Sequence, residues 1–410
     1  MKKKEEAREL YCDVVIAGCG VSGLYTALHL PREWKVVMLS KEDLESCDSM
    51  LAQGGICVLR DPEDYDSYFE DTMKAGHYEN RKESVDIMIR ESRPVIDRLL
   101  QYGVRFDKDS EGNLRYTREG AHSRPRICYH KDITGKEITT ALLEQVRKLP
   151  NVAVMEYTEM TDLLTLNGQC TGLAAQTRTG EKLKIYAEDV VLATGGIGGL
   201  YAHSTNYPLL TGDACRIADK HGVALEHMDY VQIHPTCLYS KKPGRNFLIS
   251  ESARGEGAII FNHKRERFVD ELLPRDVVTQ AILKEMEKEG VEHEWLSFEQ
   301  VPPEVVREHF PNIQQRCQEE GYDILKEPIP IVPAQHYFMG GIHVDSYSAT
   351  TMEHLYAVGE TSCNGVHGKN RLASNSLLES LVFSRRAAMH IQEKRKERKQ
   401  YESNYHAACS

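Results

Sequence analysis

A glycine-rich turn near the start of the chain constrains the fold more than any other feature. Residues 12–17 form a short run rich in valine and isoleucine, Gly18, Gly20 and Gly23 follow in the pattern Gly-x-Gly-x-x-Gly, and residues 24–30 have a helical pattern. In such a strand–turn–helix unit the glycines permit a tight turn, close approach of the backbone to a pyrophosphate, and packing of the helix on the strand. The sequence therefore predicts a Rossmann-like α/β fold that binds a nucleotide.

The residues after the second predicted strand, 35–39, argue against the commonest use of this unit. A dinucleotide-binding unit normally carries an acidic residue at the end of this strand, where it holds the ribose. Here the strand is followed by Ser40, Lys41 and Glu42, so that either Glu42 or Ser40 holds the ribose. This difference weakens the prediction of an NAD-dependent dehydrogenase.

Two later apolar runs also end in glycine. Residues 189–194 lead into Gly195, and residues 354–358 lead into Gly359 and Glu360. Each run is typical of a buried strand whose carboxyl end lies beside a cofactor. Three strand-to-glycine junctions suit a long cofactor such as FAD better than a mononucleotide.

Basic side chains recur in the second half of the chain, each inside a short motif flanked by glycine or proline. Guanidinium groups bind carboxylates through two parallel hydrogen bonds, and imidazole adds a donor of shorter reach. Two arginines and two histidines around one pocket would therefore suit a small molecule with two carboxylates. The candidate residues for this pocket are His234, Ser250, Glu251, Arg275, His336 and Arg371.

Together these motifs resemble a known family, the flavoproteins that include succinate dehydrogenase and fumarate reductase subunits and L-aspartate oxidase. The resemblance extends from Cys12 to about Ala388. Residues 46–55 resemble the flavin-contacting loop of the family, and residues 211–214 resemble a second cofactor contact. The resemblance implies FAD as the cofactor, in a Rossmann-like FAD-binding domain with an inserted α+β capping domain.

The expected domain boundaries follow from the same resemblance. We expect a discontinuous FAD-binding domain at residues 1–227 and 337–410 and a capping domain at residues 228–336, with the substrate at their interface. Members of the family usually continue into a C-terminal helical domain, whereas this chain ends at Ser410. We therefore expect that domain to be absent, in a chain that is either naturally short or shortened.

The resemblance implies that FAD is bound noncovalently. Membrane-bound succinate dehydrogenase and fumarate reductase subunits attach FAD through a histidine of the flavin-contacting loop, and Asp48 occupies that position here. The candidate cofactor-binding residues are Gly18, Gly20, Val21, Ser22, Gly23, Ser40, Lys41, Ser46, Asp48, Ser49, Met50, Ala52, Gln53, Gly54, Gly55, Ala193, Thr194, Gly195, Asp213, Gly359, Glu360, Asn375, Ser376 and Leu377.

Glu119 lies in a segment, residues 118–123, that resembles the L-aspartate oxidase members of the family. In those members a glutamate faces the ammonium group of the substrate, and the succinate enzymes lack this carboxylate. Because a buried carboxylate without a cation partner is costly, Glu119 would select aspartate over succinate. The alternative is a solvated loop residue with no part in recognition.

The resemblance also gives roles to the remaining candidates. The side chains that would hold the two carboxylates over the flavin are Arg371, His234, His336, Ser250 and Glu251. For Glu251 a supporting role, in an ionic cluster with Arg254 and Glu256, is equally compatible with the sequence.

Arg275 resembles the proton-transfer arginine of the family. An arginine normally stays protonated, so donating a proton to fumarate is easier to explain than accepting one from a substrate. The alternative is a structural ion pair between Arg275 and Asp276 or Asp270.

These residues favour FAD-dependent oxidation of L-aspartate to iminoaspartate, with oxygen or fumarate as electron acceptor. This oxidation would be the first step of de novo NAD biosynthesis, and its product would pass to quinolinate synthase. A soluble fumarate reductase is the first alternative, and Glu119 argues against it. An electron-transfer subunit that docks on an iron–sulfur partner is the second, and Asp48 argues against that.

Composition excludes several other classes of protein. A net charge of −11 argues against nonspecific nucleic-acid binding, and the chain has no apolar run long enough for a membrane helix. The eleven scattered cysteines include no Cys-x-x-Cys pair, which favours reduced thiols over disulfides or a metal site. We therefore expect a cytoplasmic protein without a metal.

Overall fold

The computed structural model describes residues 7–242 and 244–409, with the backbone alone for residues 402–409. Five parallel strands form the centre of the largest sheet, in the order β5-β2-β1-β8-β16. Their bounds are β1 (Arg8–Ala17), β2 (Val36–Leu39), β5 (Val152–Met155), β8 (Lys182–Leu192) and β16 (Leu355–Ala357). The sheet confirms the predicted Rossmann-like fold, although β8 begins several residues before the predicted start at residue 189.

Strand β1 is buried on both faces of the sheet, which explains its unbroken apolar run. Val14 and Ile16 pack with the helices on one face, while Val15 and Ala17 pack into a separate cluster on the other. Successive side chains of a strand point to opposite faces, so a strand that is covered on both sides has no solvated position for a polar residue.

An antiparallel meander covers the second face. Strands β6 (Thr158–Leu166) and β7 (Gln169–Thr177) pair with each other, and β7 pairs with the first half of β8. Smaller sheets join β3 (Ile56–Cys57) to β4 (Ile127–Cys128), and β9 (Leu225–Glu226) to β15 (Gly341–His343) and β17 (Ser362–Cys363).

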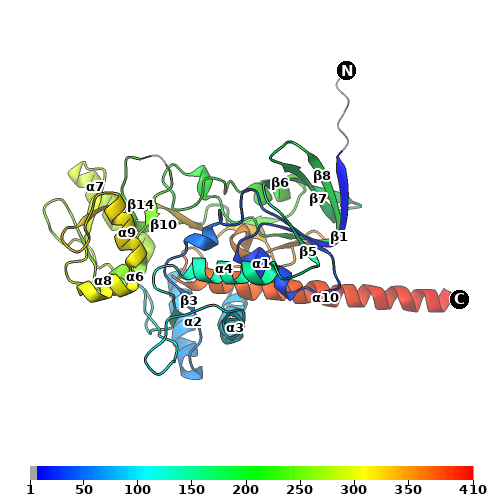
Figure 1. Cartoon of the computed structure of the whole chain (residues 1–410), viewed down its shortest axis with the longest axis horizontal. Coiled ribbons are helices and arrows are strands. Elements are labelled where there is room, and N and C mark those ends of the chain that lie inside the picture. The colour runs from blue at the N-terminus through cyan, green and yellow to red at the C-terminus, as the bar shows by residue number, and fades with distance from the viewer. Residues whose placement is uncertain (1–6, 243, 410) are drawn as a thin grey trace, which may run out of the picture.

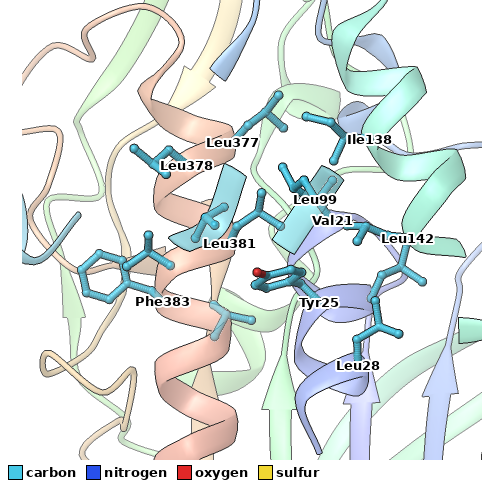
Figure 2. Close-up of a cluster of buried hydrophobic side chains, with 14 of the residues drawn as sticks. Val21, Tyr25, Leu28, Leu99, Ile138, Leu142, Leu377, Leu378, Leu381 and Phe383 are labelled. Carbon is cyan, nitrogen blue, oxygen red and sulfur yellow. The ribbon is translucent and has the colours of Figure 1, made fainter. Parts of the chain in front are cut away.

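Helices cover the first face, and the longest of them, α10, runs along the molecule and projects from it at the C-terminal end (Figure 1). The helices on this face are α1 (Val21–His29), α2 (Tyr65–Ala75), α3 (Lys82–Gln101), α4 (Thr134–Val146) and α10 (Asn375–Cys409). Helix α5 (Asp213–Lys220) packs into the cluster on the second face. Short 3-10 turns are η1 (Asp48–Leu51), η2 (Pro62–Asp64), η3 (Gly198–Leu200) and η4 (Gly359–Thr361). Figure 2 shows side chains of α1, α4 and α10 meeting in one apolar cluster, with Tyr25 and Leu381 near its centre.

A second group of elements lies at one end of the molecule and has a core of its own (Figure 1). An antiparallel sheet in the order β11-β10-β14-β13-β12 carries helices α6 to α9. The strands are β10 (Val231–Leu238), β11 (Phe247–Leu248), β12 (Ile259–Phe261), β13 (Glu294–Ser297) and β14 (Ile329–Phe338). The helices are α6 (Glu251–Gly255), α7 (Arg275–Glu289), α8 (Pro303–His309) and α9 (Pro311–Glu319).

This group supports the predicted cap. Its apolar core is built only from residues between Leu238 and Ile331, separate from the two clusters that flank the parallel sheet. We keep residues 228–336 as the proposed range of the capping domain, although β14 continues to Phe338.

Two further properties concern membranes and thiols. No helix in the described part of the chain is both long and apolar enough to span a membrane. The ten cysteines from Cys12 to Cys363 are free thiols, and the side chain of Cys409 lies outside the description.

The packing of α10 on α1 gives a test of what stabilises the fold. Leu381 is fully buried between these helices, whereas Met389 on the same helix is 44% exposed. We expect Leu381→Ala to lower the free energy of unfolding by about 2–5 kcal/mol, because it removes buried apolar contacts and leaves a cavity. Met389→Ala is the matched control. A lower urea midpoint for Leu381→Ala alone supports the assignment, and equal midpoints for the two variants contradict it.

Candidate active site

A continuous cavity runs from the glycine-rich turn after β1 to the polar side chains beneath the cap. The predicted substrate-binding residues all line it, and they are Glu119, His234, Ser250, Glu251, Arg275, His336 and Arg371. All but four of the predicted cofactor-binding residues line it as well. The fold therefore brings both predicted sets of residues to one space.

The first and third glycines of the turn have no room for a side chain. Gly18 has a φ of +116°, and a Cβ there would lie 2.0 Å from the carbonyl oxygen of Ala193. A Cβ at Gly23 would lie 2.1 Å from the carbonyl oxygen of Gly18. At Gly20 the nearest atom to such a Cβ is the hydroxyl oxygen of Ser49, at 3.0 Å, and the residue borders the cavity. These are the requirements of a dinucleotide-binding turn, so the turn fits FAD.

The end of β2 is fixed beside the cavity by an ion pair. Lys41 Nζ donates to Asp213 Oδ2 at 2.7 Å. Burial alone would lower the pKa of Lys41, but its hydrogen bonds to carboxylates raise it overall. Glu42 and Ser40 both line the cavity, Glu42 in an ion pair with Arg178 and Ser40 with its side chain buried. Both residues stay candidates for holding the ribose.

Asp48 lies in the cavity wall with one oxygen free. Its Oδ1 accepts a hydrogen bond from the backbone N–H of Tyr207 at 2.9 Å, and its buried Oδ2 has no partner among the described residues. Burial raises the pKa of Asp48 to about 7, and burial together with the charge of Asp48 raises that of Glu360 to about 8. A carboxyl group thus stands where covalent attachment would require a histidine, and we retain noncovalent binding as the prediction.

Four predicted cofactor-binding residues lie outside the cavity lining, namely Gly23, Met50, Gly359 and Asn375. Apart from Gly23, described above, each supports the wall from behind. A Cβ at Gly359 would lie 2.1 Å from the hydroxyl oxygen of Ser22. Asn375 accepts a hydrogen bond from the hydroxyl of Tyr68 at 2.8 Å, and the sulfur of Met50 lies 4.0 Å from the hydroxyl oxygen of Thr140.

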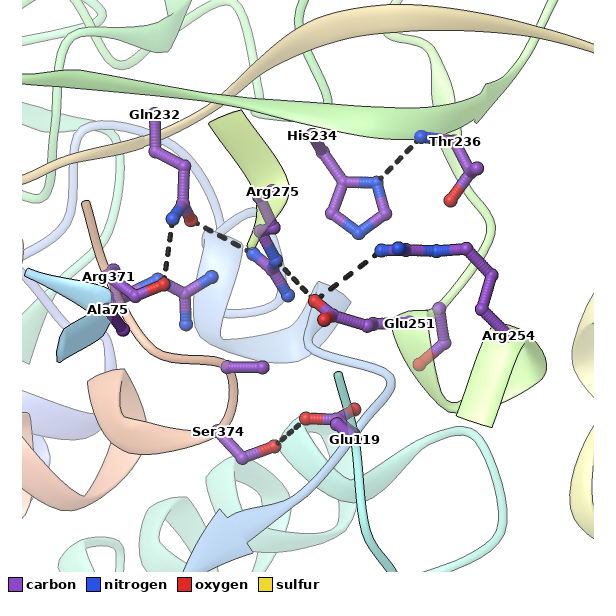
Figure 3. Close-up of polar contacts among 12 residues, drawn as sticks. Ala75, Glu119, Gln232, His234, Thr236, Glu251, Arg254, Arg275, Arg371 and Ser374 are labelled. Carbon is purple, nitrogen blue, oxygen red and sulfur yellow. Dashed lines mark hydrogen bonds and ion pairs between the residues drawn. The ribbon is translucent and has the colours of Figure 1, made fainter. Parts of the chain in front are cut away.

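Glu251 lies between two arginines at the substrate end of the cavity (Figure 3). Arg275 Nε donates to Glu251 Oε2 at 2.5 Å, and Arg254 Nη2 is 3.6 Å from the same oxygen. Burial raises the pKa of Glu251, but Arg275 and Arg254 outweigh it, so the carboxylate stays ionised. Burial lowers the pKa of Arg254, and its Nε and Nη2 have no hydrogen-bond partner in the described part of the chain.

Gln232 joins the two arginines that the sequence predicted. Its Oε1 accepts from Arg275 Nη1 at 2.9 Å, and its Nε2 donates to the carbonyl oxygen of Arg371 at 2.8 Å (Figure 3). The same Nε2 also donates to Asn370 Oδ1 at 2.8 Å. One side chain of the cap therefore fixes the relative position of Arg275 and of the segment that carries Arg371.

Arg371 itself has a free donor. Its Nη1 donates to the hydroxyl of Ser376 at 2.7 Å, and its guanidinium lies 4.6 Å from the ring centre of Tyr337. Its Nε is buried without a partner among the described residues. Burial and the charge of Arg275 lower the pKa of Arg371 to about 10, so it remains protonated at neutral pH. A buried guanidinium with an unused donor is suited to bind a carboxylate.

The two histidines lie together and are neutral. Their ring centres are 5.1 Å apart. His234 Nδ1 accepts from the backbone N–H of Thr236 at 3.2 Å, so its proton is on Nε2, which has no partner in the described structure. His336 Nδ1 lies 2.8 Å from the hydroxyl of Thr205. Burial, followed by the charge of Arg275, lowers the pKa of both rings well below the usual value. His234 therefore offers a neutral N–H donor to the cavity.

Glu119 is 3% exposed, which excludes the alternative of a solvated loop residue. Ser374 Oγ donates to its Oε2 at 2.5 Å, and Ser252 Oγ donates to its Oε1 at 2.8 Å. Burial raises the pKa of Glu119, and the charge of Glu251 raises it further. The site thus contains a buried carboxylate whose only partners among the described residues are hydroxyl groups.

Two alternatives from the sequence can be compared with these contacts. Arg275 pairs with Glu251 and, in the described part of the chain, with neither Asp276 nor Asp270. Glu256 lies near His309 and so is not part of the expected cluster with Glu251 and Arg254. Glu251 contacts two arginines and also lines the cavity, so both of its predicted roles stay open.

Ser250 has a structural role in addition to lining the cavity. Its Oγ accepts from the backbone N–H of Ser252 at 3.2 Å and caps α6.

Several residues at the site had no place in the sequence prediction. Gln232 precedes His234 by two positions on β10, so the alternation of a strand would have put both on one face. Tyr337 and Ser374 lie inside motifs that were recognised for other residues. Ser252 and Thr205 carry no such signal, because the contact of each depends on how distant segments pack.

Comparison with known proteins agrees with this geometry. The family model described as FAD binding domain matches residues 13–377. The L-aspartate oxidase of Clostridium perfringens is 51% identical over 380 residues, which cover 92% of this chain and 86% of that protein. The L-aspartate oxidase of Clostridium acetobutylicum is 47% identical and covers 92% and 87%. A solved structure of E. coli quinol fumarate reductase FrdA has a TM-score of 0.88 at 30% identity, over 94% of this chain and 70% of that one.

The glycine-rich turn provides a test of the cofactor site. Gly18→Ala would strain a backbone at positive φ by about 1–3 kcal/mol and add a clash with Ala193, so we expect FAD binding about a hundred-fold weaker. Gly290→Ala is the control, because Gly290 also has positive φ but no atom lies within 4 Å of its added Cβ. Quenching of flavin fluorescence measures both. Equal affinities of the two variants for FAD would contradict the assignment.

Proposed function

The chain belongs to the FAD binding domain family and, within it, to the L-aspartate oxidases, and from this premise we propose that it oxidises L-aspartate to iminoaspartate. FAD is its cofactor, and the lined cavity fits such a group. We infer the dicarboxylate substrate, the electron acceptor and the roles of individual residues from the geometry of the site.

The observation that carries this proposal is the charge balance of the buried cluster. Its charged side chains are Arg254, Arg275, Arg371, Glu119 and Glu251, three positive and two negative, which gives a net charge of +1 (3 − 2) with both histidines neutral. Glu360 also acts on Arg371, but burial and the charge of Asp48 raise its pKa to about 8, so it is counted as protonated at neutral pH. L-aspartate carries two carboxylates and one ammonium group, a net charge of −1. The cluster and aspartate therefore neutralise each other, as a buried site requires.

Succinate does not balance the same site. Its two carboxylates leave one negative charge in excess unless Glu119 takes up a proton. The site can thus accept succinate only at the cost of protonating Glu119, and this cost decreases as the pH falls. Discrimination against an analogue that leaves a buried polar group unpaired reaches about 10⁴-fold in favourable cases.

The substrate carboxylates have donors available on several sides. Arg371 Nε and His234 Nε2 are buried and free, and His336 lies beside them. Hydrogen bonds to a charged group contribute about 1.5–3 kcal/mol each, and they also fix the orientation of the substrate. The remaining polar group of aspartate, its ammonium, is then assigned to Glu119.

Oxidation removes one proton from the ammonium group and a hydride from Cα, and it leaves the protonated imine, which becomes the neutral imine when it loses a further proton. When bound, FAD supplies the acceptor for the hydride. Glu119, whose pKa is raised by burial and by the charge of Glu251, is assigned to receive the ammonium proton. The other residues hold the substrate in one orientation, from which both the ammonium proton and the Cα hydride can leave.

Arg275 is assigned to proton transfer in the opposite direction, when fumarate is reduced. Glu251 and Gln232 fix its guanidinium through Nε and Nη1, and it lines the cavity. A protonated guanidinium can donate a proton to the fumarate carbon adjacent to the one that receives the hydride. For aspartate oxidation its charge contributes to carboxylate binding.

The proposal also includes the electron acceptor, the enzyme that uses the product and the cellular compartment. Oxygen or fumarate would reoxidise the cofactor, and the similarity to a fumarate reductase structure supports a site that also admits fumarate. We assign the product to quinolinate synthase in NAD biosynthesis and the protein to the cytoplasm.

The direct test is anaerobic flavin bleaching. Protein loaded with FAD is mixed with L-aspartate, and separately with succinate, while the flavin absorbance is followed. Bleaching by aspartate and little or none by succinate is the expected result. Bleaching by succinate alone would replace the proposal with a fumarate reductase, and bleaching by neither substrate would refute oxidation of either.

A substitution at Glu119 tests the ammonium contact. Glu119→Gln keeps the shape of the side chain but removes its charge, so the cluster becomes +2 and matches succinate rather than aspartate. We expect the rate of flavin reduction by aspartate to fall by about 10²-fold or more, with succinate binding retained or stronger. Glu256→Gln, a change outside the cavity lining, is the control. An unchanged preference between the two substrates would contradict the assignment.

The charge balance predicts opposite effects of pH on the affinity for aspartate and for succinate. Aspartate needs ionised Glu119 and succinate needs the protonated form. As pH rises through the raised pKa of Glu119, affinity for aspartate should rise and affinity for succinate should fall. Thermal stabilisation of the FAD-loaded protein by each ligand, measured at several pH values, checks both trends. Parallel trends for the two ligands would contradict the charge balance.

A further inference from the structure

Ser252 on the cap reaches the carboxylate of Glu119, which belongs to the other domain. Its Oγ lies 2.8 Å from Glu119 Oε1, while Ser374 Oγ lies 2.5 Å from Oε2. The two oxygens of Glu119 thus each accept from a hydroxyl group, one from the first turn of α6 in the cap and one from the residue that precedes α10. Ser252 is 9% exposed and lies in the first turn of α6.

The contact depends on tight packing of the cap against the loop that carries Glu119. A Cβ at Gly255 would lie 2.7 Å from the carbonyl oxygen of Arg118, and a Cβ at Gly120 would lie 2.3 Å from Glu251 Oε1. The backbone N–H of Ala121 donates to the carbonyl oxygen of Leu272, in the cap, at 3.2 Å. The loop is therefore held on the cap at several points, and Ser252 is within reach of Glu119 because of them.

We propose that Ser252 determines specificity as a positioning residue, because its hydroxyl holds the Glu119 carboxylate in the orientation that receives the ammonium group of the substrate. This inference rests on the proposed function. It adds that recognition of the ammonium group requires the cap, since the cap supplies one of the two hydroxyls.

The hydroxyl also affects the charge of Glu119. Burial and Glu251 favour the protonated form, while Ser374, Arg275 and Ser252 favour the ionised form. The other charged groups that face this carboxylate are Arg254 and Arg371, and the titratable thiol of Cys57 lies near it. Removing the Ser252 hydroxyl would therefore raise the pKa of Glu119.

The test compares Ser252→Ala with Ser252→Thr in the FAD-loaded protein. The rate of anaerobic flavin reduction by aspartate, divided by aspartate concentration, is measured from pH 5 to 9. Loss of one hydrogen bond to a charged group should move the acid limb of the Ser252→Ala profile to higher pH by about one unit. Below that limb the variant should be about ten-fold slower with aspartate. Ser252→Thr keeps a hydroxyl and should retain the wild-type limb.

Two further measurements separate this role from a structural one. FAD affinity and the thermal unfolding midpoint, both without substrate, should change little in Ser252→Ala. In a Glu119→Gln background, adding Ser252→Ala should cause no further loss with aspartate, because the carboxylate it positions is already gone.

An acid limb that stays in place in Ser252→Ala would overturn the inference. So would equal weakening of aspartate and succinate binding, or additive losses in the double variant. If the wild-type protein is not reduced by aspartate, the proposed function fails and the inference fails with it. If the wild type is reduced and Ser252→Ala behaves identically, only the inference fails.

Discussion

Uncompensated positive charge, buried between two domains, is the constraint on which the rest of the site depends. Arg254, Arg275 and Arg371 are taken out of water, and Glu251 and Glu119 are the carboxylates that lie among them. Burying a charge without a partner is costly, and a bound anion would reduce that cost. Burial, followed by the charge of Arg275, lowers the pKa of the two histidines. Binding energy from a dicarboxylate therefore comes largely from completing an ionic cluster that folding leaves incomplete.

The fold supports this cluster from two separate cores. The parallel sheet and its helices place the glycine-rich turn and the Arg371 segment, while the cap supplies Gln232, Ser252 and Arg275 from its own packed body. Gln232 connects the two sides by bonding to Arg275 and to the backbone of Arg371. Ser252 connects them again through Glu119. The packing of the two domains therefore also determines where charged side chains lie. Each of these hydrogen bonds across the interface fixes one of them, Arg275 or Glu119.

The sequence predicted those parts of the molecule that local chemistry determines. The turn at Gly18 was predictable because positive φ and close backbone approach leave a spaced-glycine pattern, and the buried strands were predictable from their apolar runs. Motif resemblance located Arg371, although two of its contacts, Tyr337 and Gln232, are distant in the sequence. The role of Glu251 stayed open, since its two arginine neighbours come together only in the fold. Ser252 was missed for the same reason: its partner is 133 positions away, and a serine in a short helix carries no signal of such a contact.

The central claim is that the cluster recognises two carboxylates and one ammonium group at once. A crystal structure of the FAD-loaded, chemically reduced protein with L-aspartate tests it most directly, because the reduced protein cannot oxidise the ligand. The account predicts both carboxylates within hydrogen-bond distance of Arg371 and the two histidines, and the ammonium nitrogen within hydrogen-bond distance of Glu119. An ammonium group that faces away from Glu119, or a ligand that contacts neither Arg371 nor the histidines, would contradict it.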